Sequence, residues 1–194
     1  PMIAQVLSQV APLNPAKSVV VIAPHMDAVK DAVLKPWPNV AFAQQAEQLG
    51  TGHAVRMAAP HYQDFDGTVL VLYGDTPLIT TATLAKLLAE KKQHRAAIAL
   101  LGMQPQSAMG YGRLVMQKMP FVERIVECKD ASPEEKKIPW VWGGVMAFDA
   151  AFLQDALAHL KPSAATGEYY LTTLVEMAAA KSLAVVNVPA TVEE

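Results

Sequence analysis

The chain has 194 residues, 52% of them hydrophobic, and a formal net charge of −2 at neutral pH. This length suits a single domain with a substantial core. The slightly negative net charge differs from the excess of basic residues that is typical of nucleic-acid-binding domains. No uninterrupted apolar stretch is long enough to cross a bilayer, so we expect neither nucleic acid nor a membrane as a partner. Cys128 is the single cysteine, which excludes an internal disulfide and fits a reducing cytoplasm.

The two ends of the chain are unusual for a complete protein. Pro1 precedes Met2, and the final residues 192–194 follow an apolar run without an evident closing element. We therefore expect an internal fragment that folds as one domain over residues 1–194.

Strands and helices are predicted to alternate along the chain. Apolar runs rich in β-branched residues indicate buried strands, and apolar residues at one-face spacing indicate helices. In chain order we predict a strand over 18–23, a helix over 26–34, a strand over 39–43, a helix over 52–59, a strand over 69–72, a helix over 80–92, a strand over 96–101, a hairpin of strands 113–117 and 121–127, a strand over 145–148, helices over 151–159 and 171–181, and a strand over 184–188. This order predicts an α/β fold of three layers, with a mostly parallel sheet and the hairpin inserted as a lip.

Asp75 is the first candidate for chemistry, because the apolar run over 69–72 ends in Gly-Asp-Thr-Pro. A buried parallel strand delivers Asp75 to its carboxyl end, where open α/β sheets bind ligands. A carboxylate there suits Mg²⁺ held beside substrate phosphates. The alternative is an aspartate that only shapes the turn before Pro77.

A second candidate lies at residues 45–54. Gln45 offers an amide donor and acceptor, and the Gly50-Thr51-Gly52 turn allows the backbone to approach a flat ring closely. With Asp75, these residues indicate a nucleotide bound together with its metal. A solvated loop position is the alternative for Gln45.

Six motifs occur in order and carry a family resemblance. They are Gln-x-Glu-Gln-Leu-Gly-Thr-Gly-His-Ala at 45–54, Leu-Tyr-Gly-Asp-x-Pro-Leu at 72–78, Gly-Tyr-Gly-Arg at 110–113, Ile-Val-Glu-x-Lys-Asp-Ala at 125–131, Gly-Val-Met at 144–146 and Gly-Glu-Tyr-Tyr-Leu-Thr at 167–172. The series resembles the uridylyltransferase domain of bacterial bifunctional N-acetylglucosamine-1-phosphate uridyltransferase/glucosamine-1-phosphate acetyltransferase. The resemblance implies the Rossmann-like fold of nucleotide-diphospho-sugar transferases. It also implies Mg²⁺ as cofactor.

On the nucleotide side, the resemblance assigns Gln45 to the uracil edge, with Gly50 and Thr51 beside it. Tyr73 and Gly74 line the same sheet edge. Asp75 is the implied catalytic residue and metal ligand, holding Mg²⁺ against the α-phosphate.

On the sugar side, the resemblance implies Gly112 and Glu127, where a carboxylate accepts hydrogen bonds from two hydroxyls. A salt bridge to Lys129 or Arg124 is the alternative for Glu127. Trp142 departs from the family, which has a sugar-contacting asparagine there. Because an indole cannot accept hydrogen bonds as an amide does, Trp142 stacks on the sugar, blocks it, or is displaced into packing.

Arg113 and Tyr169 are left with two roles each. Arg113 contacts phosphate or forms an ion pair on the lip. Tyr169 packs internally or shapes the sugar pocket. His53 is expected to be structural, because transfer from an ionised sugar phosphate needs no proton abstraction.

The resemblance also shows what this chain lacks. The family begins with a Gly-rich loop and a Pro-Lys pair that hold the nucleotide phosphates, and both precede this chain. A second metal ligand, an asparagine, follows its end, and the acetyltransferase β-helix is absent. We therefore expect slow or no turnover.

Two classes of function follow. The first is an enzyme that forms UDP-N-acetylglucosamine and pyrophosphate from UTP and N-acetylglucosamine 1-phosphate, or a pyrophosphorylase for another sugar phosphate. The second is a non-catalytic uridine-nucleotide-binding or regulatory remnant that retains the uracil pocket.

The missing segment also has a consequence for the fold, because the family's first strand lies beside the strand that carries the Asp75 motif. Without it, strands 18–23 and 69–72 would face each other across an empty slot, leaving backbone groups unpaired. We expect these two strands to close the slot by pairing, or a second copy to lend a strand in a homo-oligomer.

Overall fold

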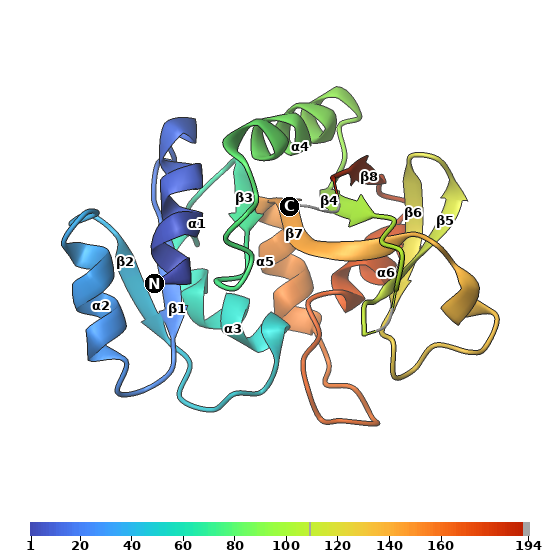
Figure 1. Ribbon diagram of the computed structural model, residues 1–194. Helices are drawn as coiled ribbons and strands as arrows, with labels where there is room; N and C mark the ends of the chain where they lie inside the picture. The colour runs from blue at the N-terminus through green and yellow to red at the C-terminus, as the bar shows by residue number, and fades with distance from the viewer. Residues whose placement is uncertain (109, 192–194) are drawn as a thin grey trace.

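The computed structural model describes residues 1–108 and 110–191 (Figure 1). Its helices are α1 (Met2–Val10), α2 (Asp27–Leu34), α3 (Thr51–Ala58), α4 (Thr81–Gln93), α5 (Ala150–His159) and α6 (Thr173–Ala180), with short 3₁₀ turns at Ala11–Leu13, Ala59–His61 and Glu135–Lys137. Its strands are β1 (Val19–Ile22), β2 (Ala41–Gln44), β3 (Thr68–Val71), β4 (Ile98–Met103), β5 (Arg113–Lys118), β6 (Phe121–Val126), β7 (Val141–Asp149) and β8 (Val185–Pro189). Each predicted strand and helix is present, with its bounds displaced by a few residues.

Helix α1 is the element that the sequence reading missed. Val6 and Leu7 are buried on its inner face, beside α2 and α4. The apolar spacing of Ile3, Val6, Leu7 and Val10 is that of an amphipathic helix, although nine residues are too few to be stable without such packing.

The strands form two sheets. β1 and β2 make a parallel pair, and six further strands follow the order β3-β7-β4-β8-β6-β5. In the larger sheet β4 and β8 are parallel, but β7 runs antiparallel between β3 and β4. Among the strands expected to be parallel, β7 therefore runs in the opposite direction. The apolar pattern alone cannot predict this, because a buried strand has the same apolar residues whichever direction it runs.

The predicted hairpin is β5–β6, and it belongs to the main sheet. β6 joins β8 and β5 joins β7, both antiparallel, so the hairpin extends the sheet edge rather than standing apart as a lip.

Helices cover both faces of the strands, which gives the three expected layers. Helices α5 and α6 pack on one face over a cluster that includes Phe148 and Met146, both fully buried. Helix α4 covers the other face above Leu101 and Val145. A smaller cluster around Val20 joins β1 to α1 and α2. Among the described residues, no helix is long and apolar enough to span a membrane.

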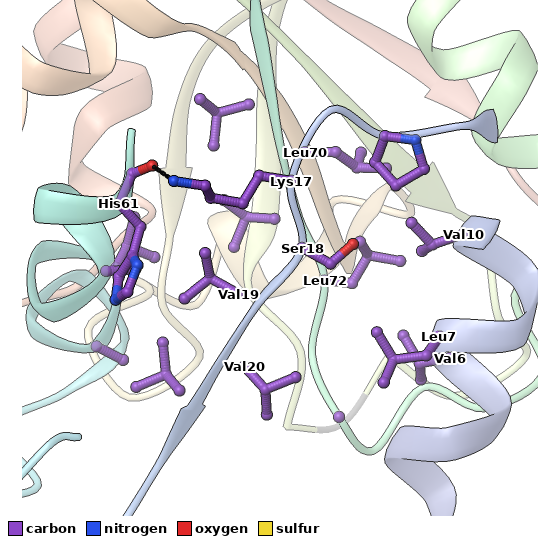
Figure 2. A pocket seen from close by; sticks show the side chains of 18 of the residues that line it. Val6, Leu7, Val10, Lys17, Ser18, Val19, Val20, His61, Leu70 and Leu72 are labelled. Atoms are coloured by element: carbon purple, nitrogen blue, oxygen red, sulfur yellow. Dashed lines mark hydrogen bonds between the residues drawn. The ribbon is translucent and has the colours of Figure 1, made fainter. Parts of the chain in front are cut away.

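Of the two outcomes expected for the slot, pairing of β1 with β3 is not observed, and a strand lent by a second copy stays a prediction. β1 pairs with β2 and β3 pairs with β7, and the two strands flank an open cavity of about 1330 Å³ (Figure 2). The cavity lies where the sequence reading placed the slot.

Candidate functional site

The loop that ends β2 is fixed by a second loop from far along the chain. Tyr169 N–H donates to the Leu49 carbonyl at 2.8 Å, and Gly52 N–H donates to the Tyr169 carbonyl at 2.7 Å. The Thr51 hydroxyl accepts a hydrogen bond from Leu171 N–H at 3.0 Å. Gly50 has φ of +102°, and a Cβ there would lie 2.7 Å from the Tyr169 carbonyl oxygen. Glycine is therefore required for this close approach.

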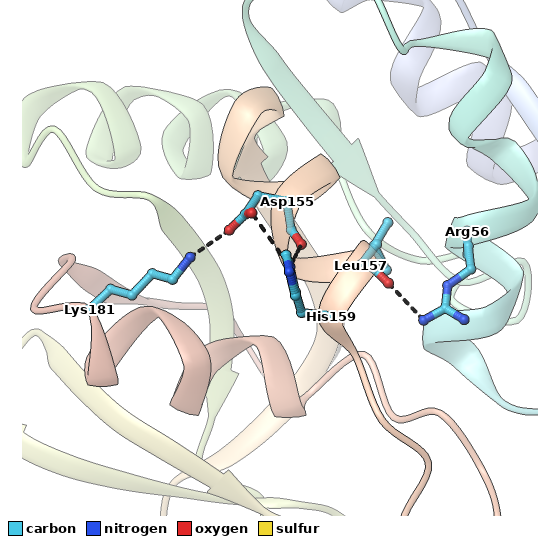
Figure 3. Close-up of polar contacts among 5 residues, drawn as sticks. All are labelled: Arg56, Asp155, Leu157, His159 and Lys181. Carbon is cyan, nitrogen blue, oxygen red and sulfur yellow. Dashed lines mark hydrogen bonds and ion pairs between the residues drawn. The ribbon is translucent and has the colours of Figure 1, made fainter.

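Arg56 anchors the same region from α3 (Figure 3). Its guanidinium donates to the carbonyls of Leu157 and Leu160, at 2.7 and 3.0 Å, where α5 ends. It also lies 4.8 Å from the centre of the Tyr169 ring, within cation–π range. Tyr169 thus packs internally and holds the Gly50–Thr51 turn, the first of its two expected roles, and a part in the sugar pocket stays a prediction.

The side-chain amide of Gln45 is partly engaged within the protein. Its Nε2 donates to the Gly50 carbonyl at 3.0 Å and lies 3.1 Å from Nδ1 of His53. These contacts use both amide hydrogens when His53 Nδ1 is the acceptor. In that tautomer the amide keeps only its acceptor Oε1 for a ligand. The structural role expected of His53 stays a prediction.

Tyr73 lies where three parts of the site meet. It follows β3 and is close enough to Thr51, Glu127 and Asp75 for these three side chains to act on the pKa of its phenol. Burial, the largest cause, and these two negative charges raise the pKa of Tyr73, so the phenol stays neutral. Its ring meets the Trp142 ring edge to face, with centroids 5.4 Å apart.

Asp75 is exposed just beyond β3, as predicted from the strand end. The turn is held by Thr76 instead, whose hydroxyl donates to the Tyr73 carbonyl at 2.8 Å. Within residues 1–108 and 110–191, the Asp75 carboxylate forms no hydrogen bond or ion pair, and no group of three acidic, His or Cys residues is placed to hold a metal. A single free carboxylate fits Mg²⁺, which keeps several waters and shares substrate phosphates.

The predicted sugar-side residues Gly112, Glu127 and Trp142 lie close to one another near β5, β6 and β7. A Cβ on Gly112 would lie 3.7 Å from Oε2 of Glu127, and Trp142 N–H donates to the Gly112 carbonyl at 3.0 Å. Glu127 Oε1 accepts a hydrogen bond from the Thr172 hydroxyl at 2.7 Å. Thr172 was missed as a partner, although it ends the last of the six motifs.

Trp142 is accounted for by packing. Its ring contacts Tyr73 and the main core cluster, and its indole N–H is buried without a hydrogen-bond partner among the described residues. This packing agrees with the third expected outcome, and a contact of Trp142 with the sugar stays a prediction.

Two expected alternatives are wrong. Arg113 is 4% exposed and donates to the backbone carbonyls of Tyr111 and Lys136, so its guanidinium faces the protein interior rather than a phosphate or an ion pair. Arg124 pairs with Glu135 at 2.8 Å, and among the described residues no ion pair joins Glu127 to Arg124 or to Lys129.

The site residues open onto two cavities. Thr51, Tyr73, Gly74 and Asp75 line part of the cavity of about 1330 Å³. Glu127 and Thr172 line a separate, polar cavity of about 460 Å³. The nucleotide-side and sugar-side residues therefore adjoin through Tyr73, each group beside its own cavity.

Comparison with known proteins places this geometry in context. The family model of the MobA-like NTP transferase domain matches residues 1–138. The bifunctional protein GlmU of Paramagnetospirillum magneticum is 44% identical over 93% of the chain and 39% of its own length. GlmU of Rhodospirillum rubrum is 42% identical over the whole chain and 43% of its own length. The chain thus spans about two fifths of the curated relatives it matches.

A solved structure has the same fold. UDP-glucose pyrophosphorylase in complex with UDP-glucose superposes with a TM-score of 0.76, over 97% of this chain and 78% of that one, at 13% identity. At this identity the likeness concerns the fold alone.

Proposed function

The chain belongs to the MobA-like NTP transferase domain family, and on that premise we propose that it is the uridylyltransferase unit of a sugar-nucleotide pyrophosphorylase. Its substrates are UTP and N-acetylglucosamine 1-phosphate, and its products are UDP-N-acetylglucosamine and pyrophosphate. The bifunctional GlmU proteins, 40–45% identical to it, support this choice over pyrophosphorylases for other sugars.

The observation that carries the proposal is that nucleotide-side and sugar-side residues both surround Tyr73. Tyr73 lines the same cavity as Thr51 of the uracil-side turn and Asp75 of the strand end, and its ring packs edge to face on Trp142 of the sugar side. Thr51, Glu127 and Asp75 are all close enough to act on the pKa of its phenol. This grouping around one neutral side chain supports adjacent positions for a nucleoside, a metal-bound phosphate and a sugar.

Uracil is read by the loop that ends β2. With Nε2 committed to Gly50, the free Oε1 of Gln45 accepts the N3–H of uracil. Adenine would present its N1 lone pair at that position, and two facing acceptors repel. The fixed turn at Gly50 and Thr51 lies beside the ring.

The transfer needs no proton abstraction. An oxygen of the sugar 1-phosphate attacks the α-phosphorus of UTP in line, the new P–O bond forms, and the bond to the bridging oxygen breaks to release pyrophosphate. Mg²⁺ bound by Asp75 would supply neutralisation of phosphate charge. Glu127, oriented by Thr172, accepts hydrogen bonds from sugar hydroxyls.

Turnover by these 194 residues is expected to be slow. Among the described residues that line the large cavity, Lys17 is the single Lys or Arg. Its amine donates to the carbonyl of His61 at 3.0 Å, and so lies near the start of β3 and not at its carboxyl end beside Asp75. Phosphate neutralisation therefore rests on the metal, and loss of a single preorganised donor typically costs about 10²–10³ in rate. This is also the observation that favours the second candidate, a uridine-nucleotide-binding unit without turnover.

Calorimetry with UTP and ATP in the presence of Mg²⁺ tests the proposal without requiring turnover. We expect UTP to bind at least tenfold more tightly, and Gln45→Ala to abolish this preference. Gln48→Ala is the matched control, because that glutamine is exposed in the same loop. Equal affinities for the two nucleotides, or a preference that survives Gln45→Ala, would contradict the uracil assignment.

A further inference from the structure

In the part of the chain that the structure describes, three buried polar atoms of two neighbouring side chains lack a hydrogen-bond partner. They are the indole Nε1 of Trp142 and both amide atoms, Nδ2 and Oδ1, of Asn187, a residue that is 2% exposed. Arg56 Nε is the fourth such atom within residues 1–108 and 110–191. Because an unpaired buried polar group costs free energy, such atoms usually have a partner. Their grouping here therefore needs a reason beyond packing.

The register of the main sheet brings these two side chains to one place. Asn187 of β8 lies opposite Leu100 of β4. Trp142 of β7 lies opposite Gly102, two residues further along β4 (Figure 1). Leu100 belongs to the core cluster against which Trp142 packs, and paired residues share a face of the sheet. Asn187 and Trp142 therefore flank β4 on the face that α5 and α6 cover, near the carboxyl end of β4, where such sheets bind ligands.

Gly102 has no side chain that would keep the indole and the amide apart. A Cβ at this position would lie 2.2 Å from Asn187 Oδ1, so the amide occupies the place of the missing side chain. The Cβ positions of directly opposite residues in an antiparallel pair are roughly 4.5–5.5 Å apart, a distance that an indole ring spans. Rotation about the side-chain bonds of Trp142 therefore brings its N–H to Oδ1 without a movement of the backbone.

In the structure the Trp142 ring lies against the nucleotide side instead. It meets the Tyr73 ring edge to face, with centroids 5.4 Å apart, and Tyr73 lines the large cavity. The backbone of Trp142 is held beside the sugar-side residues, because its N–H donates to the Gly112 carbonyl. The indole thus has two arrangements, one on Tyr73 with its ring N–H unpaired and one on Asn187 with that N–H paired. A ligand selects the second arrangement only by binding it more tightly.

We propose that Asn187 is a positioning residue for the sugar. When a UDP-sugar binds, the indole of Trp142 turns, its N–H donates to Oδ1 of Asn187, and a face of the ring packs on the C–H groups of the sugar. The hydrogen bond pairs two of the three unpaired atoms, and the sugar contact with the ring face selects this arrangement. The inference rests on the proposed function, because a UDP-sugar is its ligand.

The indole N–H signals in NMR spectra of the 194-residue chain test this movement. The chain has three tryptophans, and Trp37→Phe and Trp140→Phe assign the signal of Trp142. UDP and UDP-N-acetylglucosamine are titrated separately, because UDP carries the nucleotide without the sugar. We expect the sugar nucleotide to shift the Trp142 signal downfield and to slow its hydrogen exchange on the order of tenfold, while UDP does neither. The signal of Trp37, which packs in the cluster around Val20, is the control and should not move.

Two substitutions separate a positioning role from a structural one. Asn187→Leu removes the acceptor at similar size, so affinity for UDP-N-acetylglucosamine should fall about tenfold, without the downfield shift and without a change for UDP. Its Tm should not fall, because the amide that it replaces is unpaired in the ligand-free structure. Trp142→Phe keeps a ring but lacks the N–H. Because Asn187 acts only through that N–H, adding Asn187→Leu to Trp142→Phe should cost no further affinity.

The outcomes distinguish this inference from the proposed function. If UDP does not bind, both are overturned. If both ligands bind while the Trp142 signal stays in place, or if Asn187→Leu binds the sugar nucleotide as tightly as the parent, Asn187 has no positioning role and the proposed function stands. Weaker binding of UDP as well, or a fall in Tm, would show that Asn187 only supports the fold. If Asn187→Leu does not fold, the response of the Trp142 signal in the parent decides alone.

Discussion

The Thr172 hydroxyl donates a 2.7 Å hydrogen bond to the Glu127 carboxylate, and so ties the start of α6 to the end of β6. Thr172 is 3% exposed, so its side chain is fixed by packing before any ligand arrives. This contact holds one oxygen of Glu127 and leaves the other on the side of Gly112.

Thr172→Val is therefore expected to weaken binding of UDP-N-acetylglucosamine. Valine preserves the shape but removes the donor, and a hydrogen bond to a charged group is worth roughly 1.5–3 kcal/mol, which sets an upper limit of about 10- to 150-fold on the loss of affinity. Thr172→Ser keeps the hydroxyl and should bind nearly as the parent does. Calorimetry with UDP-N-acetylglucosamine and with UMP separates the effects, because UMP carries no sugar and its affinity should not change.

Gly50→Ala is expected to destabilise the fold more than Gly167→Ala. Both glycines have positive φ, +102° and +75°, so both substitutions add backbone strain of roughly 1–3 kcal/mol. A Cβ at position 50 would also meet the Tyr169 carbonyl oxygen at 2.7 Å, whereas position 167 has open space. Urea denaturation of the two variants measures the difference. Equal losses would show that the contact between the two loops adjusts freely.

The contrast between Asp75 and Gln45 shows how far the sequence could predict the site. A strand end is a local property, so the apolar run before Gly74 placed Asp75 correctly. The partners of Gln45 could not be foreseen in the same way, because His53 and Gly50 approach its amide only once the loop is pinned by Tyr169, over 100 positions away in the chain. Arg113 was misread for a related reason: besides the nearby Tyr111 carbonyl, it donates to the carbonyl of Lys136, 23 positions along the chain in a short 3₁₀ turn that was not predicted.

Glu135 is expected to make stability fall in acid. Its carboxylate accepts hydrogen bonds from Ser132 N–H and Arg124, both at 2.8 Å, and these contacts, Ser132 first, lower its pKa from 4.5 to about 2. A pKa that is lower in the folded state gives stability that is complete above pH 4.5 and lost as the pH falls toward 2. Urea midpoints of the parent and Glu135→Gln should therefore differ at pH 7 and converge over that window. Glu134→Gln, an exposed neighbour, is the control, and a gap that persists at pH 2 would contradict the linkage.

Asp75→Asn is expected to remove the Mg²⁺ dependence of UTP binding without changing stability. The carboxylate is exposed and unpartnered among the described residues, so its neutralisation breaks no native contact. A bound cation, in contrast, needs its charge to bridge the protein and the triphosphate. Calorimetric titrations with Mg²⁺ and with EDTA should differ for the parent and coincide for the variant, while the two Tm values agree.

Asp64→Asn is the matched control, since Asp64 is also exposed and lines the same cavity before β3. It should retain the full Mg²⁺ effect, because the strand end after β3, and not acidity of the cavity in general, is where phosphate and metal meet. If Asp64→Asn and Asp75→Asn lost the effect equally, the cation would be held by the general field of the cavity, and the metal assignment of Asp75 would be wrong. If neither lost it, the Mg²⁺ effect would come from the nucleotide alone.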